Sequence, residues 1–377
     1  MGTYRIGFVL EQALGHETVA QNLRALVPAN LEVTPTWFPV AFDAPPRWPA
    51  VTLLSTNWSI RSSYIAWTAL RRAGAPDAFD ALYFHTQTTA LFSTRYLRRT
   101  ASILSLDATP RNFDALGVAY RHARDRELIG RAKDLWTRRV YQAASHVVTF
   151  TDWARESVIR DYHVPSWLVT TIPPGTNLDF WTTHEKSSET RRRVRLLFVG
   201  GDFQRKGGDL LLDVFSHDFA DTCELDIVTY ASISSLPPGV RVHCGLAPNS
   251  LPLQHLFASA DIFVLPTRAD CFSHVLVEAM AARLPVITTA VGALGELVQP
   301  GENGFLIEPD DGRALATALA RQVADPDLRR RLGDSGRRLA EQYFDAKANT
   351  RRLLDIIEEA VDRRRPFCRS WTADVRI

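Results

Sequence analysis

Short apolar runs alternate with amphipathic segments along most of the chain. In the first half, the runs that predict buried strands are RIGFVL, ALYFH, ASILSL, HVVTFT and LVTTI. Segments with helical spacing of apolar residues separate them, at 17–26, 130–144 and 153–162. This alternation predicts a parallel sheet with helices on both faces.

The second half repeats this pattern without repeating the sequence. Its predicted strands are RLLFVGG, LDIVTY, VRVHCG, DIFVLPT, PVITT and GFLIEP. Helical segments follow, including 314–323, 326–344 and 347–365. The predicted fold is therefore of the α/β class, with two doubly wound, Rossmann-like domains. The carboxyl ends of both sheets would face one central cleft, where such folds bind ligands.

We expect a first domain over 1–178 and a second over 179–361. The polar segment 182–193 lacks an apolar face, so it is interpreted as an interdomain linker. The short aromatic segment 362–377 is expected to pack back on the first domain.

Composition narrows the class of protein. The chain has 377 residues, 46% of them hydrophobic and 23% charged, as expected of a globular protein with about two domains. A net charge of +2 gives no indication of a nucleic-acid partner. The four cysteines form no C-x-x-C pair, which argues against a zinc site or a disulfide framework. With no signal-peptide pattern and no apolar run of about 18 residues, we expect a cytoplasmic protein.

The stretch DCFSHVLVEAM carries the most informative spacing. Asp270 precedes Glu278 by eight positions, and a turn with small Ser273 lies between them. A carboxylate can accept two hydroxyl hydrogen bonds at once, which suits the vicinal diol of a sugar or ribose. Two such acids, one on a turn and one on the helix behind it, indicate a nucleotide-sugar site.

A second candidate site is the loop GGDFQRKGG, which follows the strand RLLFV. Its glycines are Gly200, Gly201, Gly207 and Gly208. The loop would lead a helix N-terminus to a phosphate, with Arg205 and Lys206 adding positive charge. The alternative is a glycine-rich turn that only serves packing. The spacing matches neither a P-loop nor G-x-G-x-x-G.

Together these motifs resemble the retaining glycosyltransferases of family 4 (glycosyl transferases group 1), which have the GT-B fold. That family combines a glycine-rich loop and a basic pair with an acid-x7-acid element and a G-x-x-E turn. The matching stretches are FVGGDFQRKGGDLLL, residues 260–311 and, more loosely, 147–181. The resemblance covers the second half nearly end to end and is weak over 1–145.

The resemblance implies roles for individual residues. Lys206 would hold the donor diphosphate, and Glu278 would bind the ribose hydroxyls. Asp270 would meet the donor sugar. The backbone of three further residues would join it there, namely Cys271, Phe272 and Ser273.

Three positions depart from the family pattern. Gly201 stands where the family has an arginine, for which Arg205 would substitute. Asp270 replaces the usual glutamate and is one methylene shorter. Ser273 replaces a common glycine and is followed by His274. These departures leave the identity of the sugar open.

The first half offers four candidate cleft residues at three places in the chain. Gly15 and His16 follow the first strand, and His85 ends the run ALYFH at a switch-point position. Asp107 stands where many family members have a histidine near the reacting sugar. Each also has a structural interpretation, because His16 could cap its loop, His85 could be a core histidine and Asp107 could cap the following turn.

The resulting hypothesis is sugar transfer with retention from an NDP-sugar to a hydroxyl acceptor, which could be a glycan, a lipid-linked molecule or a small molecule. No cofactor and no metal are expected. The alternatives are an NDP-sugar epimerase, a glycoside phosphorylase or a non-catalytic sugar-binding relative. Residues 57–74, which include Trp58, Tyr64 and Trp67, form either a helix in peripheral contact with an anionic membrane or an ordinary domain helix.

Overall fold

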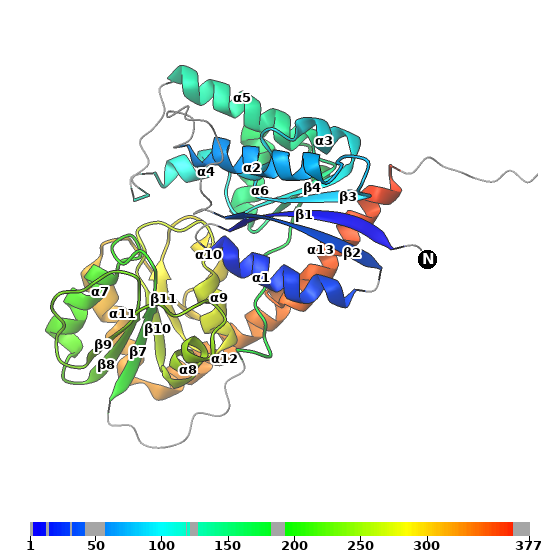
Figure 1. The fold of residues 1–377 in the computed structure, drawn as a ribbon. Coiled ribbons are helices and arrows are strands. Elements are labelled where there is room, and N and C mark those ends of the chain that lie inside the picture. The colour runs from blue at the N-terminus through cyan, green and yellow to red at the C-terminus, as the bar shows by residue number, and fades with distance from the viewer. Residues whose placement is uncertain are drawn as a thin grey trace, which may run out of the picture.

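The computed structural model describes residues 3–12, 15–30, 32–41, 57–117, 119–120, 127–181 and 193–364. They form two α/β domains, each built on a six-stranded parallel sheet (Figure 1). This confirms the predicted fold class. The predicted linker 182–193 lies, apart from its last residue, outside the described residues.

The sheet of the first domain has the strand order β2-β1-β3-β4-β5-β6. Its strands are β1 (Tyr4–Gln12), β2 (Val33–Ala41), β3 (Ala81–His85), β4 (Ala101–Leu106), β5 (His146–Thr149) and β6 (Val169–Thr171). Its helices are α1 (His16–Leu26), α2 (Trp58–Arg72), α3 (Thr94–Arg99), α4 (Pro110–Ala115), α5 (Glu127–Ala143) and α6 (Asp152–Tyr162).

The apolar pattern did not predict strand β2. It contains Pro35 and Pro39, which cannot donate a hydrogen bond to a neighbouring strand. These prolines are tolerated because β2 is an edge strand that pairs with β1 alone. Its partly exposed residues also lack the continuous apolar run of the central strands.

The second sheet has the order β12-β11-β10-β7-β8-β9. Its strands are β7 (Val194–Val199), β8 (Cys223–Val228), β9 (Val240–His243), β10 (Ile262–Leu265), β11 (Val286–Thr289) and β12 (Gly304–Ile307). Its helices are α7 (Gly208–Val214), α8 (Leu251–Ser259), α9 (His274–Ala281), α10 (Leu294–Leu297), α11 (Gly312–Ala324) and α12 (Pro326–Tyr343). All six strands were predicted from their apolar runs.

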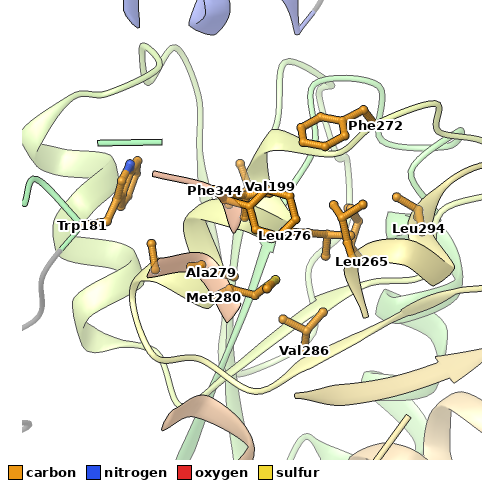
Figure 2. Packing of buried hydrophobic residues seen from close by; sticks show 14 of the residues in the cluster. Trp181, Val199, Leu265, Phe272, Leu276, Ala279, Met280, Val286, Leu294 and Phe344 are labelled. Carbon is orange, nitrogen blue, oxygen red and sulfur yellow. The ribbon is translucent and has the colours of Figure 1, made fainter. Parts of the chain in front are cut away.

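The core of the second domain supports the candidate site from behind. Figure 2 shows Leu276, Ala279 and Met280 of α9 directed into a cluster with Leu265 of β10 and Val286 of β11. These side chains are essentially inaccessible to solvent, and each contributes about 1.5–3 kcal/mol when fully buried, less for alanine. Helix α9 is therefore fixed against the sheet.

The chain returns to the first domain earlier than predicted. Helix α13 (Ala346–Asp362) packs against α1, β3 and β4 (Figure 1). The return begins at Asp345, which bridges Thr176, and Asn349 donates to the carbonyl of Pro173 at 3.0 Å. The predicted boundary at 361 is therefore corrected to about 345, because α13 buries its apolar face on the first domain. Residues 365–377 lie outside the described part of the chain.

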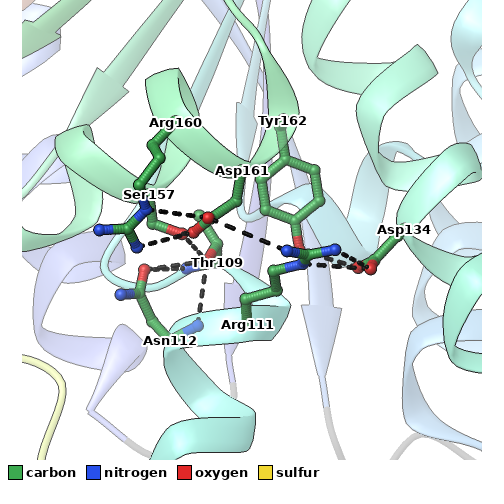
Figure 3. A network of polar contacts seen from close by, with 8 residues as sticks. All are labelled: Thr109, Arg111, Asn112, Asp134, Ser157, Arg160, Asp161 and Tyr162. Carbon is green, nitrogen blue, oxygen red and sulfur yellow. Dashed lines mark hydrogen bonds and ion pairs between the residues drawn. The ribbon is translucent and has the colours of Figure 1, made fainter.

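A polar network fixes the segment that follows β4 (Figure 3). Thr109 and Asn112 form a capping box at the start of α4, and the Thr109 hydroxyl lies 2.7 Å from that of Ser157 on α6. Arg111 donates to Asp134 of α5 at 2.7 Å. These contacts join α4, α5 and α6 just after Asp107, so that they hold the end of β4 in place.

Candidate functional site

The strongest pair of candidate residues lies where the strand order of the second sheet reverses, between β7 and β10. Lys206 follows β7, and Asp270 follows β10. The Lys206 Nζ forms an ion pair with the Asp270 Oδ2, and the two side chains are only 13% and 8% exposed. A reversal point at the carboxyl ends of parallel strands is where such sheets bind ligands. The structure therefore brings the predicted phosphate cation and the predicted sugar carboxylate together.

Arg205 has a different environment from the one its predicted role implies. Its guanidinium donates to the carbonyl of Ala269 at 2.7 Å and lies 4.6 Å from the ring centroid of Tyr120 in the first domain. Asp202 is a further partner at 3.4 Å. Arg205 therefore interacts with groups of both domains and connects them. Its contact with a phosphate stays a prediction.

The glycines of the loop are close to protein atoms. A Cβ at Gly200 would lie 2.9 Å from the Cβ of Lys206, and one at Gly201 would lie 2.9 Å from the ring of Tyr230. A Cβ at Gly208 would clash with Phe203 at 2.3 Å. The loop needs these glycines for its own packing, which makes the direct ligand contacts of Gly200 and Gly201 a prediction still to be tested.

The turn after Asp270 leads into α9. Phe272 contacts Phe150 of the first domain edge to face, with ring centroids 5.7 Å apart, and burial raises the pKa of the Cys271 thiol well above its usual value. Ser273 is the N-cap of α9, and among the described residues its buried hydroxyl has no hydrogen-bond partner. The Ser273 hydroxyl could therefore bind a ligand, and the predicted contact of the donor sugar with the backbone of these three residues stays a prediction.

Glu278 is a buried acid on α9. Its side chain is almost inaccessible, and the described residues offer it no hydrogen bond or counter-charge. Burial raises the pKa of Glu278 to about 8, since a carboxylate without partners is costly in a low-dielectric setting. A strongly shifted acid without a structural role is typical of a ligand-binding position.

The three first-domain candidates form one chain of contacts. The first sheet reverses its order between β1 and β3. His85 ends β3, and His16 begins α1, the helix that follows β1. The His85 Nε2 lies 3.1 Å from the His16 Nδ1, and the His16 Nε2 lies 4.0 Å from the Asp107 Oδ2. Burial lowers the pKa of His85 and raises that of Asp107, so that His85 is neutral at pH 7.

His274 connects the two halves of the site. A Cβ at Gly15 would lie 3.6 Å from the His274 ring, which also meets Phe272 edge to face at 5.1 Å. Burial, and then the nearby His16 and Lys206, lower the pKa of His274 to about 3. The candidates from both sheets therefore share one electrostatic environment at the interface of the domains.

Sequence reasoning missed three residues beside this site. Glu11 of β1 accepts hydrogen bonds from Thr86 and from Thr88, the latter at 2.8 Å. Tyr120 lies under Arg205, and its hydroxyl is 3.9 Å from the Cys271 sulfur. Glu296 ends the turn 292–296 and contacts the first domain. Only Glu296 had a signal in the sequence, because it lies in the stretch that resembles the family, although Ala293 stands where a G-x-x-E turn would have its glycine.

The described residues contain neither a cluster of metal-ligand side chains nor a membrane-spanning helix. No group of three or more His, Cys, Asp or Glu side chains is arranged to hold a metal ion. Within the same residues, every helix is too short or too polar to cross a bilayer.

Comparison with known families gives two matches in consecutive parts of the chain. The model described as "Glycosyltransferase Family 4" matches residues 15–180, and "Glycosyl transferases group 1" matches residues 193–325. The first match covers most of residues 1–145, over which the sequence resemblance was weak.

Curated relatives carry glycosyltransferase names. A D-inositol 3-phosphate glycosyltransferase from Xylanimonas cellulosilytica is 29% identical over 251 residues, which are 60% of this chain and 59% of that protein. An MMP alpha-(1->4)-mannosyltransferase from Mycolicibacterium hassiacum is 28% identical over 236 residues, 60% of this chain and 57% of that protein. The chain therefore spans slightly under 60% of the length of these relatives.

Solved structures share the fold over nearly the whole chain. Sucrose-phosphate synthase from Thermosynechococcus elongatus superposes with a TM-score of 0.72 at 18% identity, covering 96% of this chain and 100% of that one. HepE from Anabaena, in complex with UDP-glucose, gives 0.70 at 16% identity, covering 94% and 100%. At these identities the likeness establishes the two-domain fold alone.

Proposed function

Because the chain belongs to the glycosyl transferases group 1, or glycosyltransferase family 4, with the GT-B fold, we propose that it transfers a sugar from a nucleotide-sugar donor to a hydroxyl acceptor. The observation that carries the proposal is the Lys206–Asp270 ion pair between β7 and β10, where the strand order reverses. Asp270 also lies on the turn that leads into α9, the helix of Glu278. It combines a cation for diphosphate with two carboxylates for hydroxyl groups.

The proposed reaction retains the anomeric configuration. The bond from the anomeric carbon to the phosphate oxygen breaks, and the acceptor oxygen bonds to that carbon from the same face. The acceptor proton passes to the departing diphosphate. Lys206 and the N-terminus of α7 stabilise the negative charge that develops on the phosphates, so the proposal needs no metal. His16 and Asp107 face this site from the first domain and would orient hydroxyl groups.

The nucleotide-sugar class of donor has independent support from HepE, a protein of the same fold that was solved with UDP-glucose. The base is open to a direct test. A thermal-shift panel of UDP-, GDP-, ADP- and dTDP-sugars should raise the melting temperature with one of them, because a ligand that binds only the native state stabilises it by mass action. A panel without any shift would contradict the donor assignment.

The alternatives differ in product. Conversion of a free NDP-sugar without acceptor would identify an epimerase, and phosphate-dependent cleavage of a glycoside would identify a phosphorylase. A non-catalytic protein would bind the donor without hydrolysing or transferring it. Proton NMR of the product distinguishes retention from inversion, and transfer that persists in EDTA supports metal independence.

Peripheral contact with an anionic membrane is the second part of the proposal. Trp58 and Trp67 of α2 pack against the first domain's core, so α2 is the weaker candidate for this contact. Helix α5 instead exposes Ile129 and Leu135, by 50% and 57%, near Arg131, which forms an exposed ion pair with Glu127. A peripheral contact needs such apolar groups next to positive charge.

Liposome co-sedimentation tests this contact. The variant Leu135→Glu should lower the fraction bound to anionic vesicles, whereas Leu251→Glu, on an equally exposed leucine of the second domain, should not. Equal binding of both variants and the wild type would contradict a role for α5.

A further inference from the structure

Glu296 joins the two domains through the start of a helix. It lies on α10 in the second domain, and its carboxylate accepts hydrogen bonds from the backbone N–H groups of Asp152 at 2.8 Å and Trp153 at 2.7 Å. Both belong to the first turn of α6 in the first domain. The N-cap Thr151 serves the next free N–H, that of Ala154, at 3.2 Å. The second domain thus completes the cap of a first-domain helix.

A carboxylate is well suited to this place. The first N–H groups of a helix have no partner within the helix, and the helix dipole makes this end positive. Two charge-assisted bonds from one carboxylate also fix direction as well as distance. Burial raises the pKa of Glu296. The hydrogen bonds from the backbone N–H groups of Asp152 and Trp153 oppose this rise, because they favour the charged carboxylate.

Helix α6 is firmly attached to its own domain. Its Ser157 contacts Thr109 of the α4 capping box (Figure 3), and its Tyr162 is buried against Tyr141 of α5 with ring centroids 5.0 Å apart. A bond to the start of α6 therefore positions the first domain as a body, including the segment that carries Asp107.

Gly292, at the other end of the turn that carries Glu296, lies against the backbone of Asp270. Gly292 has φ +55°, and a Cβ there would lie 2.0 Å from the backbone carbonyl oxygen of Asp270. It would also lie 3.5 Å from Leu116, at the end of α4. Only three residues thus separate Gly292, which contacts Asp270, from Glu296, which caps α6.

We propose that Glu296 is a positioning residue that sets the first domain against Asp270, through the turn 292–296, in the arrangement that transfer requires. The inference rests on the proposed function. Glu296 touches neither donor nor acceptor; it acts by holding His16 and Asp107 opposite the Lys206–Asp270 pair. A displacement of reacting groups by about 1 Å can lower a rate by about 100-fold, so that modest loosening is measurable.

The test compares Glu296→Ala and Glu296→Gln with Glu302→Ala, which removes an exposed glutamate of the same domain. Donor binding by calorimetry should stay within about twofold of the wild type in all three. The kcat should fall about tenfold in Glu296→Ala, equivalent to about 1.4 kcal/mol, and less in Glu296→Gln, which keeps one acceptor oxygen. Small-angle scattering should show a larger radius of gyration for Glu296→Ala than for Glu302→Ala.

Wild-type kcat and radius of gyration in Glu296→Ala would overturn the proposal. A parallel loss of donor binding and thermal stability would also overturn it, because Glu296 would then hold the fold and not the relative position of the domains. A wild-type protein that binds no nucleotide sugar would refute the proposed function instead, and the scattering comparison would still test Glu296.

Discussion

Lys206 and Asp270, which lie 64 positions apart in the sequence, are each other's ion-pair partner at the carboxyl ends of β7 and β10. Both side chains are largely buried, so the contact fixes the position of each one. A diphosphate that enters this place meets a cation already fixed in position, and a sugar meets a fixed carboxylate. The pair is therefore both a structural contact and the proposed centre of the reaction.

The structural and the catalytic role of the pair can be separated by comparing the variant Lys206→Ala with the double variant Lys206→Ala/Asp270→Asn. Alone, Lys206→Ala should lower kcat by about 100- to 1000-fold, as does the loss of one charge-stabilising group elsewhere. It should also cost about 3 kcal/mol of stability, since Asp270 becomes a buried charge without a partner. The double variant should regain most of the stability and none of the rate. Recovery of both, measured by urea denaturation and initial rates, would contradict the phosphate role.

Glu278 predicts a pH dependence of donor binding. In its proposed role Glu278 binds the ribose hydroxyls as an ionised carboxylate, and with a pKa of about 8 the free protein must lose a proton to offer it. Affinity for a nucleotide sugar, whose diphosphate does not titrate in this range, should rise by up to about tenfold per unit between pH 6 and 8 and then level off. Calorimetry at three pH values checks this, and in Glu278→Gln the dependence should disappear. A flat profile in the wild type would exclude the ribose role.

The same acid predicts the opposite trend for the unliganded protein. The pKa of Glu278 is higher in the folded state, at about 8, than its usual 4.5, so the folded state binds more protons between these values. Its contribution to the free energy of unfolding is greatest below pH 4.5 and declines as the pH rises towards 8. Thermal melts of Glu278→Gln against the wild type should therefore diverge with rising pH, in favour of the variant. Parallel curves would contradict the raised pKa.

His85 is expected to matter through His16. The variant His85→Phe keeps the stacked contact with Phe150, whose ring centroid is 5.6 Å away, but loses the hydrogen bond to the His16 Nδ1. We expect kcat to fall about tenfold, because His16 loses the partner that orients it. Stability should hold or improve, since the buried His85 Nδ1 has no partner among the described residues. His146→Phe, at another strand histidine, is the control, and equal rates in both variants would count against the role.

The sequence predicted best what depends on neighbours along the chain. The strands of the second domain were evident because each is a short apolar run, and the Asp270–Glu278 spacing was evident because a turn and one helix carry both acids. Strand β2 was hidden because its prolines and half-exposed residues are tolerated only at a sheet edge.

Contacts that need both domains had no signal in the sequence. Nothing in it places Tyr120 under Arg205 or the ring of His274 beside Gly15, since these depend on the angle at which the domains meet. The early return of the chain at Asp345 has the same origin. An amphipathic helix such as α13 shows that it buries one face but not which domain receives that face.

Gly207 offers the sharpest test of the loop that carries Lys206. Gly207 and Gly245 have nearly equal φ angles, +74° and +72°, but a Cβ at Gly207 would lie 1.9 Å from the Pro266 carbonyl oxygen, whereas one at Gly245 meets nothing within 4 Å. Gly245→Ala should therefore cost only the backbone strain of about 1–2 kcal/mol. Gly207→Ala should cost several kcal/mol and weaken nucleotide-sugar binding, because the loop must shift away from β10 and carry Lys206 with it. Urea denaturation and calorimetry compare the two variants. Equal stability and equal affinity would show that the loop accepts the extra Cβ without moving Lys206. The close contact between Gly207 and Pro266 would then not be what positions Lys206.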